Sequence, residues 1–230
     1  MHGIFRKPWH TPKPPVVILV PGLDSVKEEL HNYGDDFLRR GMAVLAIDGP
    51  GQGEMEFEHA MRYDYEVPIK YAIDYLESRP EIDAQRVGLM GVSLGGYYVV
   101  RAAAHEHRVR ATIENCGPYN PAESFQQRPM LSREAYIHRL KAPTVEEGMH
   151  KLQQFNLQGV AEKVQSPLLV IHGERDRLVP AEQGRRIAED AGSNAELWMF
   201  EDGNHVCNNI IYKHRPQQAD WMHQKLLDGR

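Results

Sequence analysis

The fold of this 230-residue chain is decided by one stretch, Arg86-Val87-Gly88-Leu89-Met90-Gly91-Val92-Ser93-Leu94-Gly95-Gly96. It begins as a short apolar run typical of a buried strand, breaks at a glycine, and continues into residues 97–104, which have a helical pattern. The residues around the break match Gly-x-Ser-x-Gly, the pattern of a nucleophile on a sharp strand-to-helix turn. Glycines two positions before and after Ser93 remove side chains that would collide in such a turn. We therefore predict that Ser93 is a nucleophile held above a sheet.

Strand and helix patterns alternate on both sides of this turn. Strands are expected at residues 3–8, 16–20, 43–47, 87–91, 111–114, 167–173 and 195–200. Helices are expected at residues 25–40, 67–78, 97–104, 180–191 and 217–227, the first with a capping box made by Ser25 and Glu28. This alternation predicts an α/β fold with a mostly parallel, doubly wound sheet, in which active sites lie at the carboxyl ends of the strands.

Residues 115–165 interrupt the alternation with a helical segment that is too long for a simple connection. We interpret it as a small lid insertion over the active edge of a single domain spanning residues 1–230. Its larger apolar side chains could line an apolar pocket or form the core of the lid. They are Tyr119, Phe125, Met130, Leu131, Tyr136 and Met149.

Composition argues against several classes of partner. The formal charge is −5 and no Lys/Arg-rich run is present, so neither nucleic acid nor a membrane surface is expected as a partner. The longest apolar run, residues 16–20, is far shorter than the roughly 20 residues that span a bilayer. No signal peptide is visible, and two cysteines do not make a disulfide framework, so we expect a cytoplasmic protein. A homodimer remains compatible with the sequence.

A serine hydroxyl becomes a good nucleophile when a base removes its proton and a third group orients that base. Asp176 lies in a turn after the strand expected at 167–173, and His205 lies in a turn after the strand at 195–200. The order Ser93, Asp176, His205 is that of a hydrolase triad built on a parallel sheet. We therefore predict these three as the catalytic residues.

Acyl transfer also requires two backbone N–H groups that stabilise the developing oxyanion. We predict the N–H of Leu94, which follows the nucleophile, and the N–H of Leu23, in the loop after the strand at 16–20. The glycine-rich loop at 48–54 lacks both the Lys-Ser/Thr pair and the spacing of phosphate-binding loops, so we interpret it as a structural turn.

The other polar side chains near these loops are interpreted as structural. They are Glu174, Asp202, His172, His105, His107, Cys207 and Asp24. Glu174 and Asp202 are alternatives to Asp176 as the carboxylate of the triad, but each lies in a turn where a solvated carboxylate is expected. His105 and His107 lie at the end of a helix and lack the further ligands that a metal site needs, so we interpret them as surface residues. Cys207 is not surrounded by a nucleophile turn, so we interpret it as a small apolar residue of the core. We interpret Asp24 as a helix cap rather than a substrate contact.

Over its whole length the chain resembles the α/β-hydrolase superfamily. Its more specific stretches are similar to the branch that holds 2,6-dihydroxypseudooxynicotine hydrolase and the fermentation–respiration switch esterases. These stretches are residues 20–29, 48–54 and 203–209, with Arg215-Pro216 and Ala219-Asp220-Trp221 beyond them. The resemblance places the three predicted catalytic residues at the triad positions. It implies cleavage of esters, as in some members, or of carbon–carbon bonds beside a ketone, as in others.

Two features depart from that branch. Members usually carry a sizeable helical segment ahead of the first strand, whereas this sequence begins almost at that strand, so we expect a trimmed or short form with an open pocket. Carbon–carbon cleavage in the branch is associated with a further acid near the lid. Glu123 lies in that region, but the local match is poor and we interpret it as a solvated carboxylate.

The resulting hypothesis is a serine hydrolase that cleaves carboxylic esters through an acyl-enzyme, without a cofactor or metal. The first alternative is hydrolysis of a carbon–carbon bond in a diketone or acyl-aromatic compound. The second is a partner-binding regulator with little turnover. The expected partner is a small-molecule ester or ketone. Because a general base must be neutral, activity is expected to fall as acid protonates the histidine.

Overall fold

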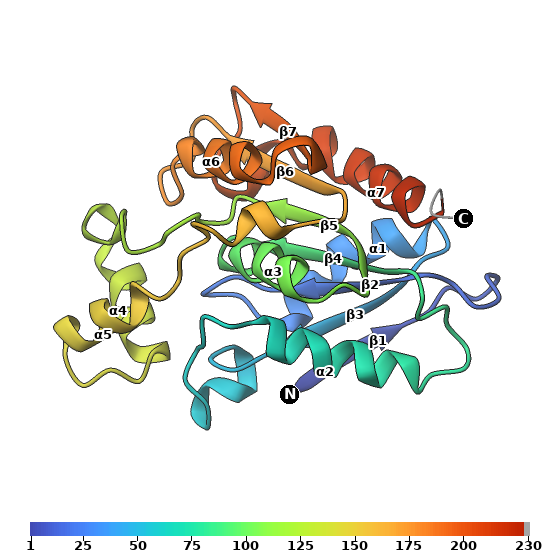
Figure 1. Ribbon diagram of the computed structural model, residues 1–230, viewed down its shortest axis with the longest axis horizontal. Coiled ribbons are helices and arrows are strands. Elements are labelled where there is room, and N and C mark those ends of the chain that lie inside the picture. The colour runs from blue at the N-terminus through green and yellow to red at the C-terminus, as the bar shows by residue number, and fades with distance from the viewer. Residues whose placement is uncertain (228–230) are drawn as a thin grey trace.

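The computed structural model describes residues 1–227, which form a seven-stranded sheet with helices on both faces (Figure 1). The strands are β1 (His2–Arg6), β2 (Val16–Val20), β3 (Ala43–Asp48), β4 (Val87–Val92), β5 (Val109–Asn115), β6 (Leu168–Gly173) and β7 (Ala195–Phe200). They lie in the order β1-β3-β2-β4-β5-β6-β7, and every pairing is parallel except that of β1 with β3. The predicted α/β fold with a mostly parallel sheet is confirmed.

Helices cover both faces of this sheet. They are α1 (His31–Leu38), α2 (Glu66–Glu77), α3 (Leu94–His105), α4 (Met130–Arg139), α5 (Val145–Leu152), α6 (Ala181–Ala191) and α7 (Ile211–Leu227). The helices α2, α3 and α6 pack on one face, and α1 and α7 pack on the other (Figure 1).

The strand β2 shows how the sequence forms two cores. Val16, Ile18 and Val20 belong to the apolar cluster that contains α2, α3 and α6. Val17 and Leu19 point the other way and join the cluster that contains α1 and α7. All five are buried, as expected of a parallel strand with both faces covered. This packing holds the carboxyl ends of the central strands in fixed positions.

The strand order reverses between β2 and β4. After β2 the chain moves outward to β3, and it then returns to form β4 on the other side of β2. Ligands of open α/β sheets bind beyond the carboxyl ends of the strands at such a point. The loops that follow these two strands carry Leu23 and Ser93, so the fold brings them to the same edge.

The first predicted helix differs in its beginning. Residues Lys27–Leu30 form a 3₁₀ turn before α1, and the residue preceding that turn, Val26, makes no side-chain capping bond. The Ser25 hydroxyl instead accepts a hydrogen bond from the Gly22 N–H, at 2.8 Å. The predicted capping box is therefore wrong, because the serine is used to shape the loop after β2.

The last helix begins at Ile211, earlier than the expected residue 217, and it contains Pro216. A proline normally ends a helix because it lacks an N–H and crowds the preceding turn. Pro216 is exposed, so the carbonyl left without its donor lies on the solvent side of the helix. The packing of α7 against the sheet compensates for the lost hydrogen bond.

The insertion is helical, as predicted, and stands beyond one end of the sheet (Figure 1). It contains α4, α5 and two 3₁₀ turns, Phe125–Gln127 and Ala161–Lys163. Of its large apolar side chains, Tyr119, Phe125 and Tyr136 belong to the core, and Met149 packs beside it. Met130 and Leu131 are exposed. Tyr136 also lines the pocket described below.

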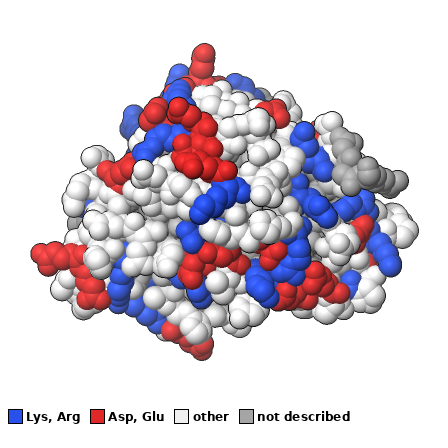
Figure 2. Space-filling view, in the orientation of Figure 1, with Lys and Arg blue, Asp and Glu red and all other residues white. Residues whose placement is uncertain are grey.

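Basic and acidic side chains are interspersed on the face shown in Figure 2. That face presents a mixed surface rather than a field of one sign. None of the helices within residues 1–227 is long and apolar enough to cross a membrane.

Candidate active site

Ser93 occupies the turn between β4 and α3. Its backbone has φ 55° and ψ −126°, a conformation that residues other than glycine rarely adopt. The turn is tight because a Cβ at Gly91 would collide with the Gly95 carbonyl, and one at Gly95 would collide with the Val20 carbonyl. The Ser93 N–H is anchored on the carbonyl of Asn115 at 2.8 Å. These contacts hold the hydroxyl at the carboxyl edge of the sheet.

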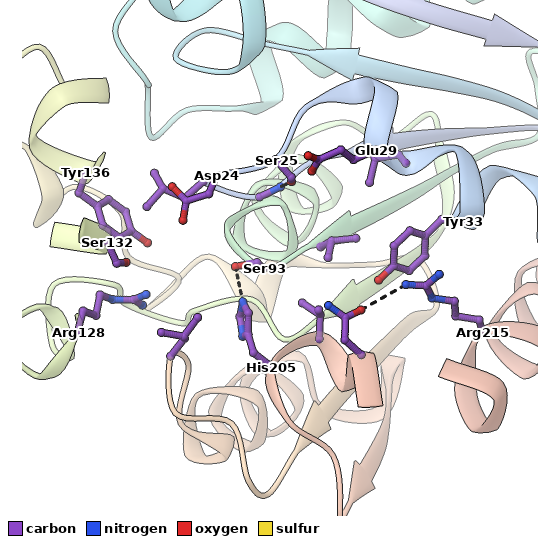
Figure 3. A pocket seen from close by; sticks show the side chains of 17 residues that line it. Asp24, Ser25, Glu29, Tyr33, Ser93, Arg128, Ser132, Tyr136, His205 and Arg215 are labelled. Atoms are coloured by element: carbon purple, nitrogen blue, oxygen red, sulfur yellow. Dashed lines mark hydrogen bonds between the residues drawn. The ribbon is translucent and has the colours of Figure 1, made fainter. Parts of the chain in front are cut away.

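The structure brings the three residues of the predicted triad together. The Nε2 atom of His205 lies 2.8 Å from Ser93 Oγ (Figure 3), and its Nδ1 atom lies 2.7 Å from Asp176 Oδ2. The other carboxylate oxygen of Asp176 accepts hydrogen bonds from the N–H groups of Leu178 and Val179, at 2.8 and 2.9 Å. This arrangement lets a neutral imidazole donate from Nδ1 and accept the serine proton at Nε2.

The ionisation of Asp176 supports that arrangement. Burial alone would raise the pKa of its carboxyl group, because a buried charge loses its hydration. The hydrogen bond and charge of His205 oppose this, together with the two backbone N–H groups, and the pKa of Asp176 lies below its ordinary value of 3.8. The carboxylate therefore stays charged at neutral pH and keeps the proton on Nδ1 of His205.

Two unused backbone donors flank the serine. Within the described chain, neither the Leu23 N–H nor the Leu94 N–H donates a hydrogen bond to another residue. The loop that carries Leu23 lies against the nucleophile, since a Cβ at Gly22 would stand 3.0 Å from Ser93 Cβ. Both donors predicted for the oxyanion are thus free beside the serine.

Gln52 holds this loop in place, a role that the sequence did not reveal. Its side chain is 1% exposed and donates from Nε2 to the Pro21 carbonyl at 2.7 Å. Its Oε1 atom accepts hydrogen bonds from the Gly49 N–H and the Tyr65 hydroxyl. The loop at 48–54 is therefore a structural turn that also braces the segment carrying Leu23. The one feature of the sequence that could have indicated this role is a glutamine placed among glycines directly after a strand.

Ser93 and His205 line a pocket of about 320 Å³ (Figure 3). Its walls come from the loops after β2, β6 and β7, from the insertion, and from the helices α1 and α7. Arg128 and Arg215 contribute positive charge to these walls, and Asp24 and Glu29 contribute negative charge. Asp24 lines the pocket and makes no helix cap, because the cap position of the following turn is Val26. The interpretation of Asp24 as a capping residue was therefore wrong.

Residues 35–228 match the prolyl oligopeptidase family. The chain belongs to this family. Its seven-stranded sheet and the turn at Ser93 are those of the wider α/β-hydrolase superfamily, so the predicted superfamily is confirmed.

Similar proteins support the same assignment. The chain is 31% identical over 217 residues to the 2,6-dihydropseudooxynicotine hydrolase of Paenarthrobacter nicotinovorans, a match that covers 94% of this chain and 59% of the relative. A crystal structure of 2,6-dihydroxy-pseudo-oxynicotine hydrolase superposes with a TM-score of 0.93 at 30% identity, over 99% of this chain and 65% of that one. This chain therefore spans less than two thirds of these relatives.

Est1E of Butyrivibrio proteoclasticus, solved with ferulic acid bound, has the same fold. It superposes with a TM-score of 0.80 at 19% identity, over 98% of this chain and 95% of that one. At this identity the likeness concerns the fold alone.

Apart from Asp24, the other polar side chains considered in the sequence analysis do not line the pocket of Ser93. Glu174 pairs with Arg185, and Asp202 pairs with Lys213 at 2.6 Å. His172 is buried in β6, 3.2 Å from the carboxylate of Glu114. The pair His105 and His107 is exposed, Cys207 is a buried free thiol, and no group of three or more metal-ligating side chains occurs within residues 1–227.

Glu123, the candidate acid of the insertion, also forms its contacts with residues outside the pocket. Its carboxylate lies 2.6 Å from the Arg186 guanidinium and 3.2 Å from Gln183 Nε2. These contacts lower the pKa of Glu123 against the effect of burial, which alone would raise it. Glu123 is therefore a charged surface residue that does not line the pocket of Ser93.

Proposed function

We propose that this chain hydrolyses carboxylic esters through a covalent acyl-enzyme. The observation that carries this proposal is the continuous hydrogen-bonded chain from Ser93 Oγ through His205 to Asp176, at the floor of an open pocket. A serine so placed beside a neutral imidazole has the means to lose its proton as it attacks.

Each step of the reaction uses one of these groups. Ser93 Oγ attacks the acyl carbon while His205 Nε2 takes the hydroxyl proton. The N–H groups of Leu23 and Leu94 stabilise the tetrahedral oxyanion. The bond between the acyl carbon and the alkoxide oxygen then breaks, and His205 gives its proton to the alkoxide, which departs as an alcohol while the acyl group remains on Ser93 as an ester. A water molecule, deprotonated by His205, releases the carboxylic acid and restores the serine.

The surroundings of Glu123 favour an ester over a carbon–carbon bond as the substrate. The acid proposed from the sequence for carbon–carbon cleavage is paired with Arg186 and does not line the pocket. Carbon–carbon hydrolysis is the alternative, supported by the similarity to the pseudooxynicotine hydrolase and by the free carboxylate of Asp24 in the pocket. Comparing kcat/KM for phenyl acetate and for 1-phenylbutane-1,3-dione separates the two reactions.

The decisive experiment is hydrolysis of p-nitrophenyl butyrate by the wild type and by Ser93→Ala. We expect release of p-nitrophenol by the wild type and loss of turnover in the variant, with a fluorophosphonate probe attached to Ser93 in the wild type alone. An unchanged rate in Ser93→Ala would exclude the proposed nucleophile. Folded wild-type protein that neither reacts with the probe nor turns over would favour the regulator instead.

A further inference from the structure

Arg128 is the most buried arginine among residues 1–227, with 7% of its surface exposed. It lies in the insertion, between the 3₁₀ turn Phe125–Gln127 and α4, and it lines the pocket of Ser93. Figure 3 shows its guanidinium turned toward the side of the pocket where Ser93 and His205 lie. A charged group is therefore held largely out of water in the wall of the pocket that contains the nucleophile.

This guanidinium has no carboxylate partner within the described chain. Its one side-chain hydrogen bond is from Nη2 to the hydroxyl of Ser124, at 3.3 Å, and its Nε atom is buried without a partner. The ring of Tyr136 lies 5.3 Å from the guanidinium carbon. Burial raises the pKa of Tyr136, although the charge of Arg128 opposes this, so the phenol stays neutral and supplies no counter-charge.

Several other shielded cations of the same fold have carboxylate partners, although Arg133 and Arg215, both less buried than Arg128, also have an Nε atom without a partner within residues 1–227. Arg101 makes a bidentate pair with Glu66 at 2.8 and 2.9 Å, and Arg139, also in the insertion, lies 2.7 Å from Glu56. The buried ammonium of Lys27 is surrounded by three carboxylates. A buried charge without a partner is strongly destabilising, so Arg128, as the most buried arginine, calls for a partner that the described chain does not itself provide.

The acids of the pocket do not fill that role. Asp24 and Glu29 are both exposed, so water hydrates their carboxylates, and neither forms an ion pair with Arg128. The guanidinium is a planar fork of N–H donors that matches a carboxylate with two parallel hydrogen bonds. The missing partner is thus an anion that enters the pocket from solution.

We propose that Arg128 binds a carboxylate of the substrate, so that the preferred esters are anionic, such as half-esters of dicarboxylic acids. This inference rests on the proposed ester hydrolysis and names its substrate class. When the carboxylate pairs with Arg128, the acyl carbon is held beside Ser93. Binding energy from a remote charge then positions the reacting bond.

The test compares two esters with acyl chains of the same carbon number, mono-p-nitrophenyl glutarate and p-nitrophenyl valerate. We expect the wild type to prefer the glutarate half-ester in kcat/KM. Arg128→Gln should reduce kcat/KM for the half-ester about 10- to 100-fold, the usual effect of losing a hydrogen bond to a charged group, and leave the valerate rate within about 3-fold. Arg128→Lys should lie between the two, because it keeps the charge and loses the fork.

Two further variants serve as controls. Arg175→Gln removes the same charge from an exposed position that does not line the pocket, and it should not change the ratio of the two rates. Arg215→Gln removes the other arginine of the pocket. A loss of half-ester preference in Arg215→Gln and not in Arg128→Gln would overturn the assignment to Arg128. The valerate rate shows in every variant whether the site is still folded.

A binding measurement separates this inference from the proposed function. Glutarate should raise the thermal midpoint of the wild type and not that of Arg128→Gln, because a ligand stabilises the state that binds it. Valerate hydrolysis that depends on Ser93, with no half-ester preference and no glutarate effect, would overturn the inference and leave the esterase intact. Glutarate binding through Arg128 without hydrolysis of either ester would retain the anion site and reject the ester reaction.

Discussion

Replacement of Asp176 by asparagine should remove most of the activity through the tautomer of His205. The Oδ1 atom of Asp176 accepts two backbone N–H groups, those of Leu178 and Val179. In Asp176→Asn the amide oxygen is expected to keep these two bonds, so the NH₂ group must face Nδ1 of His205. The imidazole then accepts at Nδ1 and carries its proton on Nε2, where it can no longer take the proton of Ser93.

The size of the effect follows from the same two bonds. Turning the amide to restore the productive tautomer would place NH₂ against both backbone donors and leave two buried N–H groups unsatisfied. Each costs about 1–3 kcal/mol, so the productive arrangement is disfavoured by roughly 2–6 kcal/mol. With tenfold in rate for each 1.36 kcal/mol, kcat should fall on the order of 10²- to 10⁴-fold with little change in KM.

The assay is p-nitrophenyl butyrate hydrolysis, with thermal unfolding as the check on folding. Asp202→Asn is the matched control, because that carboxylate lies in the turn after β7 and pairs with Lys213 rather than with the imidazole. Its activity should stay within about 2-fold of the wild type. Asp176→Ala does not impose the wrong tautomer and should be at least as active as Asp176→Asn. A kcat of Asp176→Asn within tenfold of the wild type would refute this account of the site.

Three other predictions concern the support of the site and the fold. Gln52→Leu should lower kcat about tenfold with KM unchanged in steady-state kinetics, because the loop carrying one oxyanion donor loses its brace; a change in KM alone would contradict this. Gly95→Ala should reduce stability by about 2 kcal/mol or more in urea unfolding, since the added Cβ meets backbone carbonyls that cannot move aside; a neutral effect would show that the turn is looser. Burial lowers the pKa of His214 from 6.5 to about 4, and Arg215 adds to this. The unfolded chain therefore binds the proton first, so stability is complete above about pH 6.5 and declines by about 2 kcal/mol at pH 5. His214→Leu should lose less stability than the wild type between pH 7.5 and pH 5, and equal losses would exclude the histidine.

The elements that could be predicted from the sequence are those specified by local chemistry. A β-branched run marks β2, and a glycine-flanked serine after a buried strand indicates the turn at Ser93. Asp176 and His205 each follow a strand, and parallel strands end at one edge, so their meeting could be inferred without any contact being known. Pro216 shows the limit of such reasoning, because its effect on α7 is overridden by packing against the sheet.

Contacts between distant segments could not be predicted in this way. Gln52 reaches the loop after β2 across 31 positions of sequence, and nothing in its neighbourhood specifies Pro21 as its partner. Arg128 is a single arginine before a proline, and the sequence does not show that it is buried. Its significance comes from what surrounds it: a hydroxyl, an aromatic ring and a pocket, but no carboxylate.

Several energetically unfavourable local features occur around this pocket. Ser93 adopts a positive φ, as do Val206 and Cys207 directly after His205, and Arg128 is buried without a partner. Each of these features costs free energy. Folding alone gives no reason for four such costs to occur at one edge of the sheet. They become intelligible together if the pocket is completed by an anionic ester, whose carboxylate neutralises Arg128 while its acyl carbon meets the strained serine.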